Sequence, residues 1–201
     1  MSKLSIYYFD VNGISVDELI KHSFLNENDI KELDKYTSSE AKKEKIISTH
    51  FKNKYVGEYY LNEYGKPLSN NTYFNISHSK GMIVCLISDY EVGIDIEKIR
   101  PYKKELKSYI SNEDEEKYIK TDANFYEIWT SKESLVKANG KGLRTNIKSI
   151  PALPINGRVS YEEKVYNRKS VRLDNYIISV TIESDVDYKI DLIKEELDYA
   201  W

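Results

Sequence analysis

The chain has 201 residues, of which 40% are hydrophobic and 31% are charged, and its formal net charge is −3. These proportions describe a soluble globular protein and give no support to nucleic-acid binding. They also exclude a membrane-spanning segment, because no apolar run is long enough to cross a bilayer. There is no signal-peptide apolar region at the N-terminus, and the single cysteine, Cys85, can form no internal disulfide. We therefore expect a cytoplasmic protein with neither membrane nor nucleic acid among its partners.

The first part of the chain is expected to form one strand, then helices, then strands. The run that begins at Ser15 has the capping-box pattern that opens a helix. From Ile47 to Tyr59, apolar and aromatic residues recur about every four positions, which predicts a long helix. Loop-forming residues follow at 65–67 and 70–71. In chain order, the expected elements are a strand at 3–9, helices from Ser15, at 26–35 and at 39–61, and strands at 73–77, 82–88 and 92–98.

After Pro101, which breaks the chain, the pattern becomes helical and then returns to strands. Asp174 and Asn175 mark a turn between two of the later strands. This order of elements predicts an α+β fold, and the order repeats coarsely about residues 88–92. The expected helices lie near 103–109, 112–120 and 122–139, and the expected strands lie at 164–167, 170–173, 176–182 and 188–193.

The helix expected at 122–139 carries charged residues at the edge of an apolar stripe. At 100° per residue, Phe125, Trp129 and Val136 fall within about 40° of one another and form the stripe. Glu133 lies at its edge, with Lys137 beyond it. A carboxylate at a core boundary, followed by Gly-Lys-Gly, favours a site for a cation and an anionic ligand. The alternative is a surface pair of Glu133 with Lys137, which contributes roughly a few tenths of a kcal/mol.

The strand expected at 92–98 alternates strictly between apolar and acidic residues at positions 94–97. Ile94 and Ile96 face one side, whereas Asp95 and Glu97 face the other. Two carboxylates on one face suit a hard divalent cation, which takes oxygen ligands. The alternative is an ordinary half-exposed strand. For His78, earlier in the chain, the alternative to a functional role is a loop histidine with a satisfied hydrogen bond.

Three runs in this order resemble the Sfp-type 4′-phosphopantetheinyl transferases, and Gly65-Lys66-Pro67 resembles a further segment of that family. The resemblance implies two similar α+β halves, at 1–90 and 91–201, related by a pseudo-twofold axis, with the active site in the cleft between them. Because one chain contains both halves, the resemblance also implies a monomer. The three runs are Asn75-Ile76-Ser77-His78-Ser79, Gly93-Ile94-Asp95-Ile96-Glu97, and Trp129-Thr130-Ser131-Lys132-Glu133 with Lys137, Gly140, Gly142 and Leu143.

The resemblance implies a transfer reaction that uses coenzyme A. Its 4′-phosphopantetheine arm would pass to a serine of an apo carrier protein of the acyl, polyketide or peptidyl class, and adenosine 3′,5′-bisphosphate would leave. By motif position, Asp95, Glu97 and Glu133 are the implied Mg²⁺ ligands. Glu133 is also the implied base for the acceptor serine, either directly or through metal-bound water. Lys137 is the implied partner of the phosphates, whose charge must be neutralised in such a reaction.

The resemblance implies that Ser77 and His78 contact a phosphate of coenzyme A. Lys66 either reaches the 3′-phosphate or is a solvated loop residue. The family usually has arginines on the preceding helix, but here no arginine precedes Arg100. Lysines such as Lys54 would have to replace them without the guanidinium fork. The possible substitutes are Lys43, His50, Lys52 and Lys54.

Two other functions stay open. A degenerate homologue would bind coenzyme A or a carrier protein without catalysis, although Asp95, Glu97, Glu133 and Lys137 are all present. A metal-dependent phosphohydrolase would need the carboxylates and a water nucleophile, but no carrier protein. Transfer of a labelled arm to a carrier serine, compared with release of adenosine bisphosphate without carrier, separates the three functions.

Overall fold

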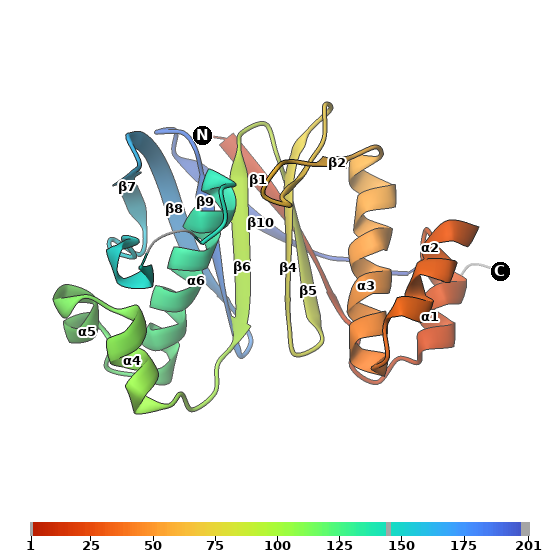
Figure 1. Ribbon diagram of the computed structural model, residues 1–201, viewed down its shortest axis with the longest axis horizontal. Helices are drawn as coiled ribbons and strands as arrows, with labels where there is room; N and C mark the ends of the chain where they lie inside the picture. The colour runs from red at the N-terminus through yellow and green to blue at the C-terminus, as the bar shows by residue number, and fades with distance from the viewer. Residues whose placement is uncertain (1, 144–145, 198–201) are drawn as a thin grey trace.

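A computed structural model describes residues 2–143 and 146–197 (Figure 1). Within this part of the chain, α1 to α3 gather at one end of the molecule beside the first of two four-stranded sheets, and α4 to α6 lie toward the other end, where α6 packs against the second sheet. This arrangement confirms the predicted α+β class. The first sheet has the order β10 (Tyr188–Lys194), β1 (Ser2–Asp10), β5 (Met82–Ser88), β4 (Tyr73–Ser79), and the second has the order β6 (Val92–Lys98), β9 (Tyr176–Ile182), β8 (Lys164–Leu173), β7 (Gly157–Tyr161).

The last strand of the chain completes the first sheet. β10 pairs with β1 in parallel, from Tyr188 opposite Ser2 to Lys194 opposite Tyr8. β5 pairs with both β1 and β4 in antiparallel register. The chain therefore returns to the edge of the first sheet after it has built the second. The predicted division into halves at 1–90 and 91–201 stays a prediction. It would assign β10 to the second half, although β10 pairs with β1 in the first sheet.

Three helices lie beside the first sheet, and each begins at a side chain that accepts hydrogen bonds from the first turn. These caps are Ser15, Asn26 and Ser38. The predicted extension of the third helix to residue 61 is wrong. A π-helical turn ends at Val56, and Gly57, at φ 75°, reverses the chain. The elements are α1 (Val16–His22), α2 (Glu27–Glu32), a 3₁₀ turn (Leu33–Lys35), α3 (Ser39–Phe51), the π turn (Lys52–Val56), and a hairpin of β2 (Tyr60–Leu61) with β3 (Pro67–Leu68).

The helix predicted at 122–139 has these bounds in the structure, and it packs on β6 and β9. It is capped by Thr121 at its start and by Gly140, at φ 75°, at its end. The two strands predicted at 164–167 and 170–173 are one continuous strand, β8, which pairs with β9. β7, which precedes β8, was not predicted. The helical elements here are α4 (Lys104–Ile110), α5 (Glu113–Tyr118), α6 (Asp122–Asn139) and a 3₁₀ turn (Ile147–Ser149).

Apolar side chains of both sheets share one core, which fixes the position of each sheet against the other. Its central residues are almost inaccessible to solvent, as is expected for a close-packed interior. No helix within residues 2–143 and 146–197 is both long and apolar enough to cross a membrane. The shared core contains Leu4, Ile6, Met82, Val84 and Leu86 from the first sheet and Val92, Ile94, Ile96, Ile178, Val180 and Ile182 from the second.

Candidate active site

Two strands from different sheets, β4 and β6, run side by side and are joined by side chains. Oδ1 of Asn75 accepts a hydrogen bond of 2.9 Å from the backbone N–H of Ile94. The Oγ atoms of Ser77 and Ser79 accept longer bonds of 3.4 Å from the next two alternate N–H groups of β6. The bonded residues are 19 positions apart in each case, so the two strands are parallel. The free edge of β6 is thus satisfied by side chains of β4.

The carboxylates of β6 point into this junction. Oδ1 of Asp95 accepts a hydrogen bond of 2.9 Å from Ser77, and Oε2 of Glu97 accepts one of 2.7 Å from Ser79. Ile94 and Ile96, which alternate with these carboxylates, face the shared core, and this confirms the predicted alternation. Asp95 is only 7% exposed, so the alternative of an ordinary half-exposed strand is wrong.

Helix α6 lies directly against β6 because Gly93 has no side chain. A Cβ atom at Gly93 would lie 2.0 Å from the carbonyl oxygen of Ser134 and 2.4 Å from the backbone nitrogen of Ala138. Hydroxyl pairs then hold the helix to β9, where Ser134 meets Thr181 at 2.8 Å. A second pair, Thr130 with Ser179, is 2.7 Å apart. This packing brings the helix residues Glu133 and Lys137 to the strand carboxylates.

Lys137 joins the helix to the strand. Its Nζ lies 2.7 Å from Oδ1 of Asp95 and donates to Ser77 at 3.0 Å and to the carbonyl of Ile94 at 3.1 Å. The alternative of a Glu133–Lys137 surface pair does not describe these contacts, because the ammonium group is turned toward β6. Ser77, Asp95 and Lys137, which are distant in the sequence, are therefore brought together.

Glu133 interacts with both strand carboxylates. Burial raises its pKa, and the negative charges of Asp95 and Glu97 raise it further, whereas Lys137 lowers it. Burial likewise raises the pKa of Glu97, against the hydrogen bond from Ser79. In residues 2–143 and 146–197, however, no group of three or more His, Cys, Asp or Glu side chains is arranged to hold a metal ion. The three carboxylates are of the type that a hard cation prefers, but they do not converge on one point, and Asp95 is engaged by Lys137.

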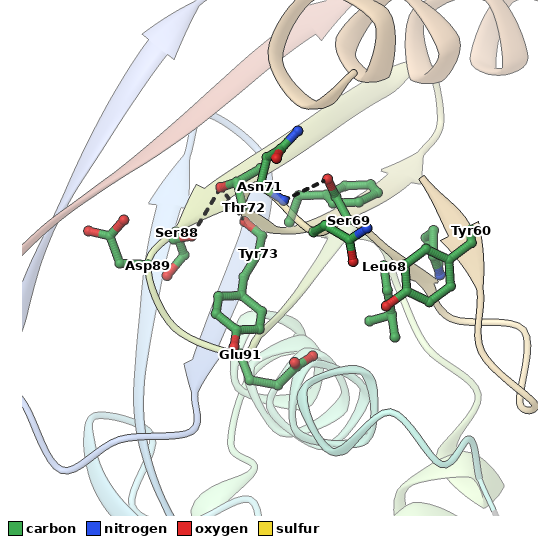
Figure 2. A pocket seen from close by; sticks show the side chains of 12 residues that line it. Tyr60, Leu68, Ser69, Asn71, Thr72, Tyr73, Ser88, Asp89 and Glu91 are labelled. Atoms are coloured by element: carbon green, nitrogen blue, oxygen red, sulfur yellow. Dashed lines mark hydrogen bonds between the residues drawn. The ribbon is translucent and has the colours of Figure 1, made fainter. Parts of the chain in front are cut away.

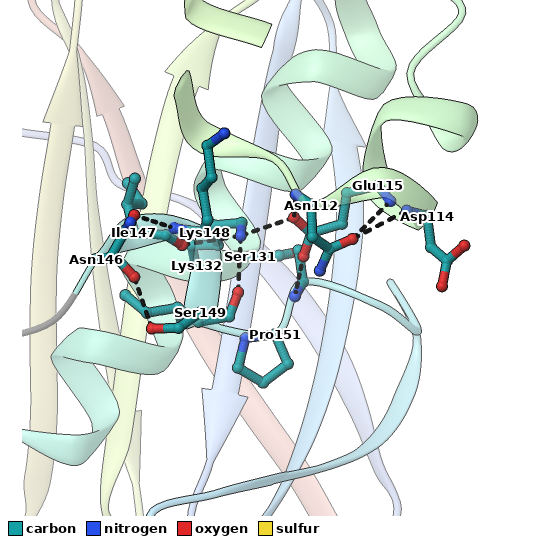
Figure 3. Close-up of polar contacts among 12 residues, drawn as sticks. Asn112, Asp114, Glu115, Ser131, Lys132, Asn146, Ile147, Lys148, Ser149 and Pro151 are labelled. Atoms are coloured by element: carbon teal, nitrogen blue, oxygen red, sulfur yellow. Dashed lines mark hydrogen bonds and ion pairs between the residues drawn. The ribbon is translucent and has the colours of Figure 1, made fainter. Parts of the chain in front are cut away.

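Lys132, the neighbour of Glu133, has a structural position (Figure 3). Its side chain and that of Glu115 are each 1% exposed and lie 2.8 Å apart. Lys132 also donates to the carbonyls of Ile147 and Ile150. Glu115 accepts from the N–H of Ala152, so the pair ties α5 and α6 to the segment 147–152. This pair was not predicted from the sequence, in which the capping box that contains Glu115 is a local signal for the start of α5 and not for the ion pair.

Arg168 of β8 holds the same segment through backbone carbonyls. Its side chain is buried, and burial lowers its pKa to about 10. The guanidinium group donates to the carbonyl of Ser131 on α6 and to three carbonyls of the segment 151–154. Together with Lys132, it fixes the back of the helix that carries Glu133.

His78 lies in a different environment from its neighbour Ser77. Its ring is half exposed, and Nδ1 lies 3.1 Å from a carboxylate oxygen of Glu44 on α3. His78 and Glu44 line a pocket of about 630 Å³ together with Ser79 and three lysines. These lysines are Lys43, Lys80 and Lys98. The pocket therefore combines three lysines with two glutamates, Glu40 and Glu44, and it includes the hydroxyl that contacts Glu97.

Lys66 does not lie in that pocket. It forms an ion pair with Glu91 and donates to the carbonyls of Val92 and Ala138, and its side chain is 8% exposed. The expectation of a solvated loop lysine is wrong, and its ammonium group is not beside His78. The residue instead ties the turn of the β2–β3 hairpin to the start of β6 and the end of α6.

The side chains of Lys54 and His50 also lie outside the pocket of His78. They contact Glu195, which directly follows β10 and lies beside α3. The buried carboxylate of Glu195 accepts from Lys54 and from Tyr55, and Nε2 of His50 lies 3.2 Å from it. Nδ1 of His50 accepts a bond of 3.0 Å from the N–H of Phe24. Burial lowers the pKa of His50, which agrees with a neutral ring. Of the helix residues proposed to replace arginine, Lys43 is the one that lines the pocket of His78.

A further pocket, of about 430 Å³, lies beside the hairpin (Figure 2). Thr72 donates there to the carbonyl of Ser88, and the aromatic rings of Tyr60 and Tyr73 stand at its rim. None of the carboxylates of the candidate site lines it. Glu91, which does line it, is the partner of Lys66.

A family model described as the 4′-phosphopantetheinyl transferase superfamily matches residues 91–190, the segment that contains Asp95, Glu97, Glu133 and Lys137. Over this segment the chain is similar to that superfamily, and curated members match it as well. Three curated members illustrate the similarity. Over 95 residues the chain is 42% identical to the 4′-phosphopantetheinyl transferase gsp of Aneurinibacillus migulanus. It is 36% identical over 110 residues to 4′-phosphopantetheinyl transferase Sfp of Bacillus subtilis (strain 168), and 33% identical over 132 residues to 4′-phosphopantetheinyl transferase ffp of Bacillus subtilis.

These superfamily matches cover part of each protein. They include 44%, 50% and 58% of this chain, and 40%, 49% and 57% of the three relatives. The chain therefore spans about half the length of the curated relatives that it matches.

Proposed function

We propose that this protein transfers the 4′-phosphopantetheine arm of coenzyme A to a serine hydroxyl of an apo carrier protein of the acyl, polyketide or peptidyl class. Adenosine 3′,5′-bisphosphate is the leaving product. The observation that carries the proposal is the convergence of Asp95 and Lys137, with Glu97 and Glu133 beside them, in a segment similar to this superfamily. Similarity alone would support the reaction class, but not which side chains perform it.

Asp95, Glu97 and Glu133 are the residues that would hold Mg²⁺. Their chemistry fits, because burial and the nearby negative charge of Asp95 raise the pKa of both Glu133 and Glu97, and a hard cation would relieve this strain on the ionised carboxylates. The ion, when bound, supplies positive charge to the pyrophosphate of coenzyme A. Lys137 supplies a second positive charge at the same place, and charge neutralisation of this kind is the main catalytic demand of phosphoryl transfer.

Glu133 is the proposed general base. It accepts the proton of the carrier serine, directly or through a water molecule, as the hydroxyl attacks the β-phosphate. No hydrogen bond or ion pair to its carboxylate is seen among residues 2–143 and 146–197, so the group is available. The half-buried Trp129, one turn earlier on α6, packs against the apolar core and orients the helix.

The pocket that contains His78 and three lysines is the proposed site for the phosphate at the adenosine end of coenzyme A. Lys43, Lys80 and Lys98 provide the positive charge, and charge-assisted bonds to phosphate are the strong ones. Of the lysines expected from the sequence to meet this phosphate, Lys43 lines the pocket, whereas Lys54 and Lys66 are paired with Glu195 and Glu91. Ser77 contacts Asp95 and Lys137 instead, so its part in phosphate binding is through the ammonium group beside it.

The proposal extends to the architecture. Two similar halves, with the active site in a cleft between them, agree with the supply of Ser77 by the first sheet and of Asp95 by the second. A monomer suffices for such a site, because both halves belong to one chain. A cytoplasmic location suits a donor and a carrier that are both intracellular molecules.

The test is to incubate the protein with coenzyme A, Mg²⁺ and a panel of apo carriers and to weigh the carriers by mass spectrometry. A carrier should gain the mass of the arm, and adenosine 3′,5′-bisphosphate should appear in equal amount. Glu133→Gln keeps the shape of the side chain and should abolish the gain while the melting temperature stays close to that of the wild type. Binding of coenzyme A without any transfer would instead favour a non-catalytic homologue, and release of the bisphosphate without carrier would favour a hydrolase.

A further inference from the structure

Ser77 and Ser79 make the same pair of contacts, displaced by two residues. The Oγ of Ser77 accepts from the N–H of Ile96 and donates to Asp95, and the Oγ of Ser79 accepts from the N–H of Lys98 and donates to Glu97. Each serine thus joins the carboxylate 18 positions later and the backbone N–H 19 positions later. We call this two-bond unit a serine clip.

The clip requires a hydroxyl group. An ionised carboxylate only accepts hydrogen bonds, and the free edge of β6 presents N–H groups that only donate. A serine oxygen serves both, because it accepts from the N–H while its proton goes to the carboxylate. Both serines are buried, at 6% and 9% exposure, so water competes little for these bonds.

Asn75, two positions before Ser77 on β4, provides a natural contrast to the two clips. Asn75 accepts the N–H of Ile94 in the same way, but the residue that corresponds to Asp95 and Glu97 is Gly93, which has no side chain. Asn75 therefore joins the strands without touching a carboxylate. If the serines served only to join β4 to β6, they would need no more than Asn75 provides.

We propose that Ser79 is a positioning residue, which holds the Glu97 carboxylate in the orientation that a divalent cation needs, and that Ser77 does the same for Asp95. In its metal role, this inference rests on the proposed function. A carboxylate that is already oriented loses less side-chain freedom when it binds a cation. Ser79 gives the cleaner test, because Ser77 also accepts a hydrogen bond from Lys137.

The experiment titrates the full-length, metal-free protein with Mn²⁺ as the probe, by calorimetry. Ser79→Ala should weaken Mn²⁺ affinity roughly 10- to 100-fold, the usual effect of losing a group that orients a metal ligand. Ser79→Thr, which keeps the hydroxyl, should restore most of the affinity. Asn75→Ala is the matched control: it should lower the melting temperature but leave the Mn²⁺ affinity as in the wild type. Equal affinities of Ser79→Ala and the wild type would overturn the inference.

Crystal structures of the metal-free wild type and Ser79→Ala keep the inference separate from the metal assignment. The Glu97 side chain should be displaced or disordered in Ser79→Ala and unchanged in Asn75→Ala. A wild type that binds no Mn²⁺ would refute the proposed metal site, whereas an unmoved Glu97 in Ser79→Ala would refute the clip. If Ser79→Ala does not fold, Ser79→Cys keeps the shape with a weaker donor, and it should also lose Mn²⁺ affinity.

Discussion

The ammonium group of Lys137 on α6 lies 2.7 Å from the carboxylate of Asp95 on β6, and both side chains are largely removed from solvent. Neither residue is near the other in the sequence, and the contact exists because Gly93 lets the helix approach the strand. The pair places a positive and a negative group of the candidate site within one hydrogen bond. It therefore connects the packing of α6 on β6 directly to the proposed chemistry.

Asp95→Asn should remove turnover while the fold survives. The variant keeps the shape of the side chain, but Lys137 loses its charged partner and the site loses one carboxylate. Because Lys137 keeps its bonds to Ser77 and to the carbonyl of Ile94, the free energy of unfolding should fall by only about 1–3 kcal/mol. Carrier modification and urea unfolding measure the two effects. Full activity in excess chelator, or in Asp95→Asn, would contradict the magnesium assignment.

Gly93→Ala should destabilise the protein through contact rather than through backbone strain. The added methyl group would meet the backbone of α6, and overpacking of this kind costs about 1–3 kcal/mol or more. Gly142→Ala is the comparison, because its φ is 70° and no atom lies within 4 Å of the added group. Its cost should be that of a left-handed backbone, about 1–2 kcal/mol. Only Gly93→Ala should also impair carrier modification, since it displaces Glu133 and Lys137.

Lys132→Met should lower stability far more than the loss of a surface lysine. It leaves the carboxylate of Glu115 buried without its cation, which costs about 3–5 kcal/mol. Lys117→Met, which removes an exposed pair with Asp114, should change stability by about 1 kcal/mol or less. Guanidinium unfolding of both variants gives the comparison. A well-folded Lys132→Met with normal unfolding but lost coenzyme binding would show that Lys132 serves the substrate instead.

Acid should destabilise the contact between α3 and the end of β10. Burial lowers the pKa of His50 from its ordinary value of 6.5, so the unfolded chain binds a proton that the folded chain does not. The stability from the neutral ring is present above pH 6.5 and is lost as the pH falls toward the lowered value. The hydrogen bonds to Glu195 lower its pKa below 4.5 despite its burial, and they add a second loss at more acidic pH. His50→Gln should have a lower melting temperature at neutral pH and a flatter decline just below pH 6.5. An unchanged slope in that variant would rule out His50 as the group responsible.

Glu44→Gln should strengthen binding of coenzyme A. The Glu44 carboxylate lies 3.1 Å from His78 in a pocket where three lysines would meet a phosphate, so it repels that phosphate and competes for the ring. Its neutral replacement should raise affinity for coenzyme A, and it should do little for 3′-dephospho-coenzyme A. Calorimetric titration with both compounds gives the ratio. An equal gain for both compounds would mean that the pocket does not bind the 3′-phosphate.

Short-range patterns in the chain predicted the elements that carry the site. The alternation of Val92 to Lys98 and the periodicity of 122–139 determine a strand and a helix with the observed bounds, because backbone geometry acts between near neighbours. Such patterns failed where a single residue or a distant partner decides where an element ends. Gly57 ended the helical run of α3 and the π turn before residue 61, and pairing with β9 kept β8 continuous.

By itself, the sequence determined which residues have the chemistry for the site: three carboxylates, a lysine, a histidine and the serines of β4. Only the tertiary structure decided which of them meet. It directed Lys66 to Glu91 and Lys54 to Glu195, brought Lys137 to Asp95, and returned β10 to the first sheet. The physical reason is that a buried charge must find a partner, and the partners here lie 25 to 141 positions away, beyond the reach of any local pattern.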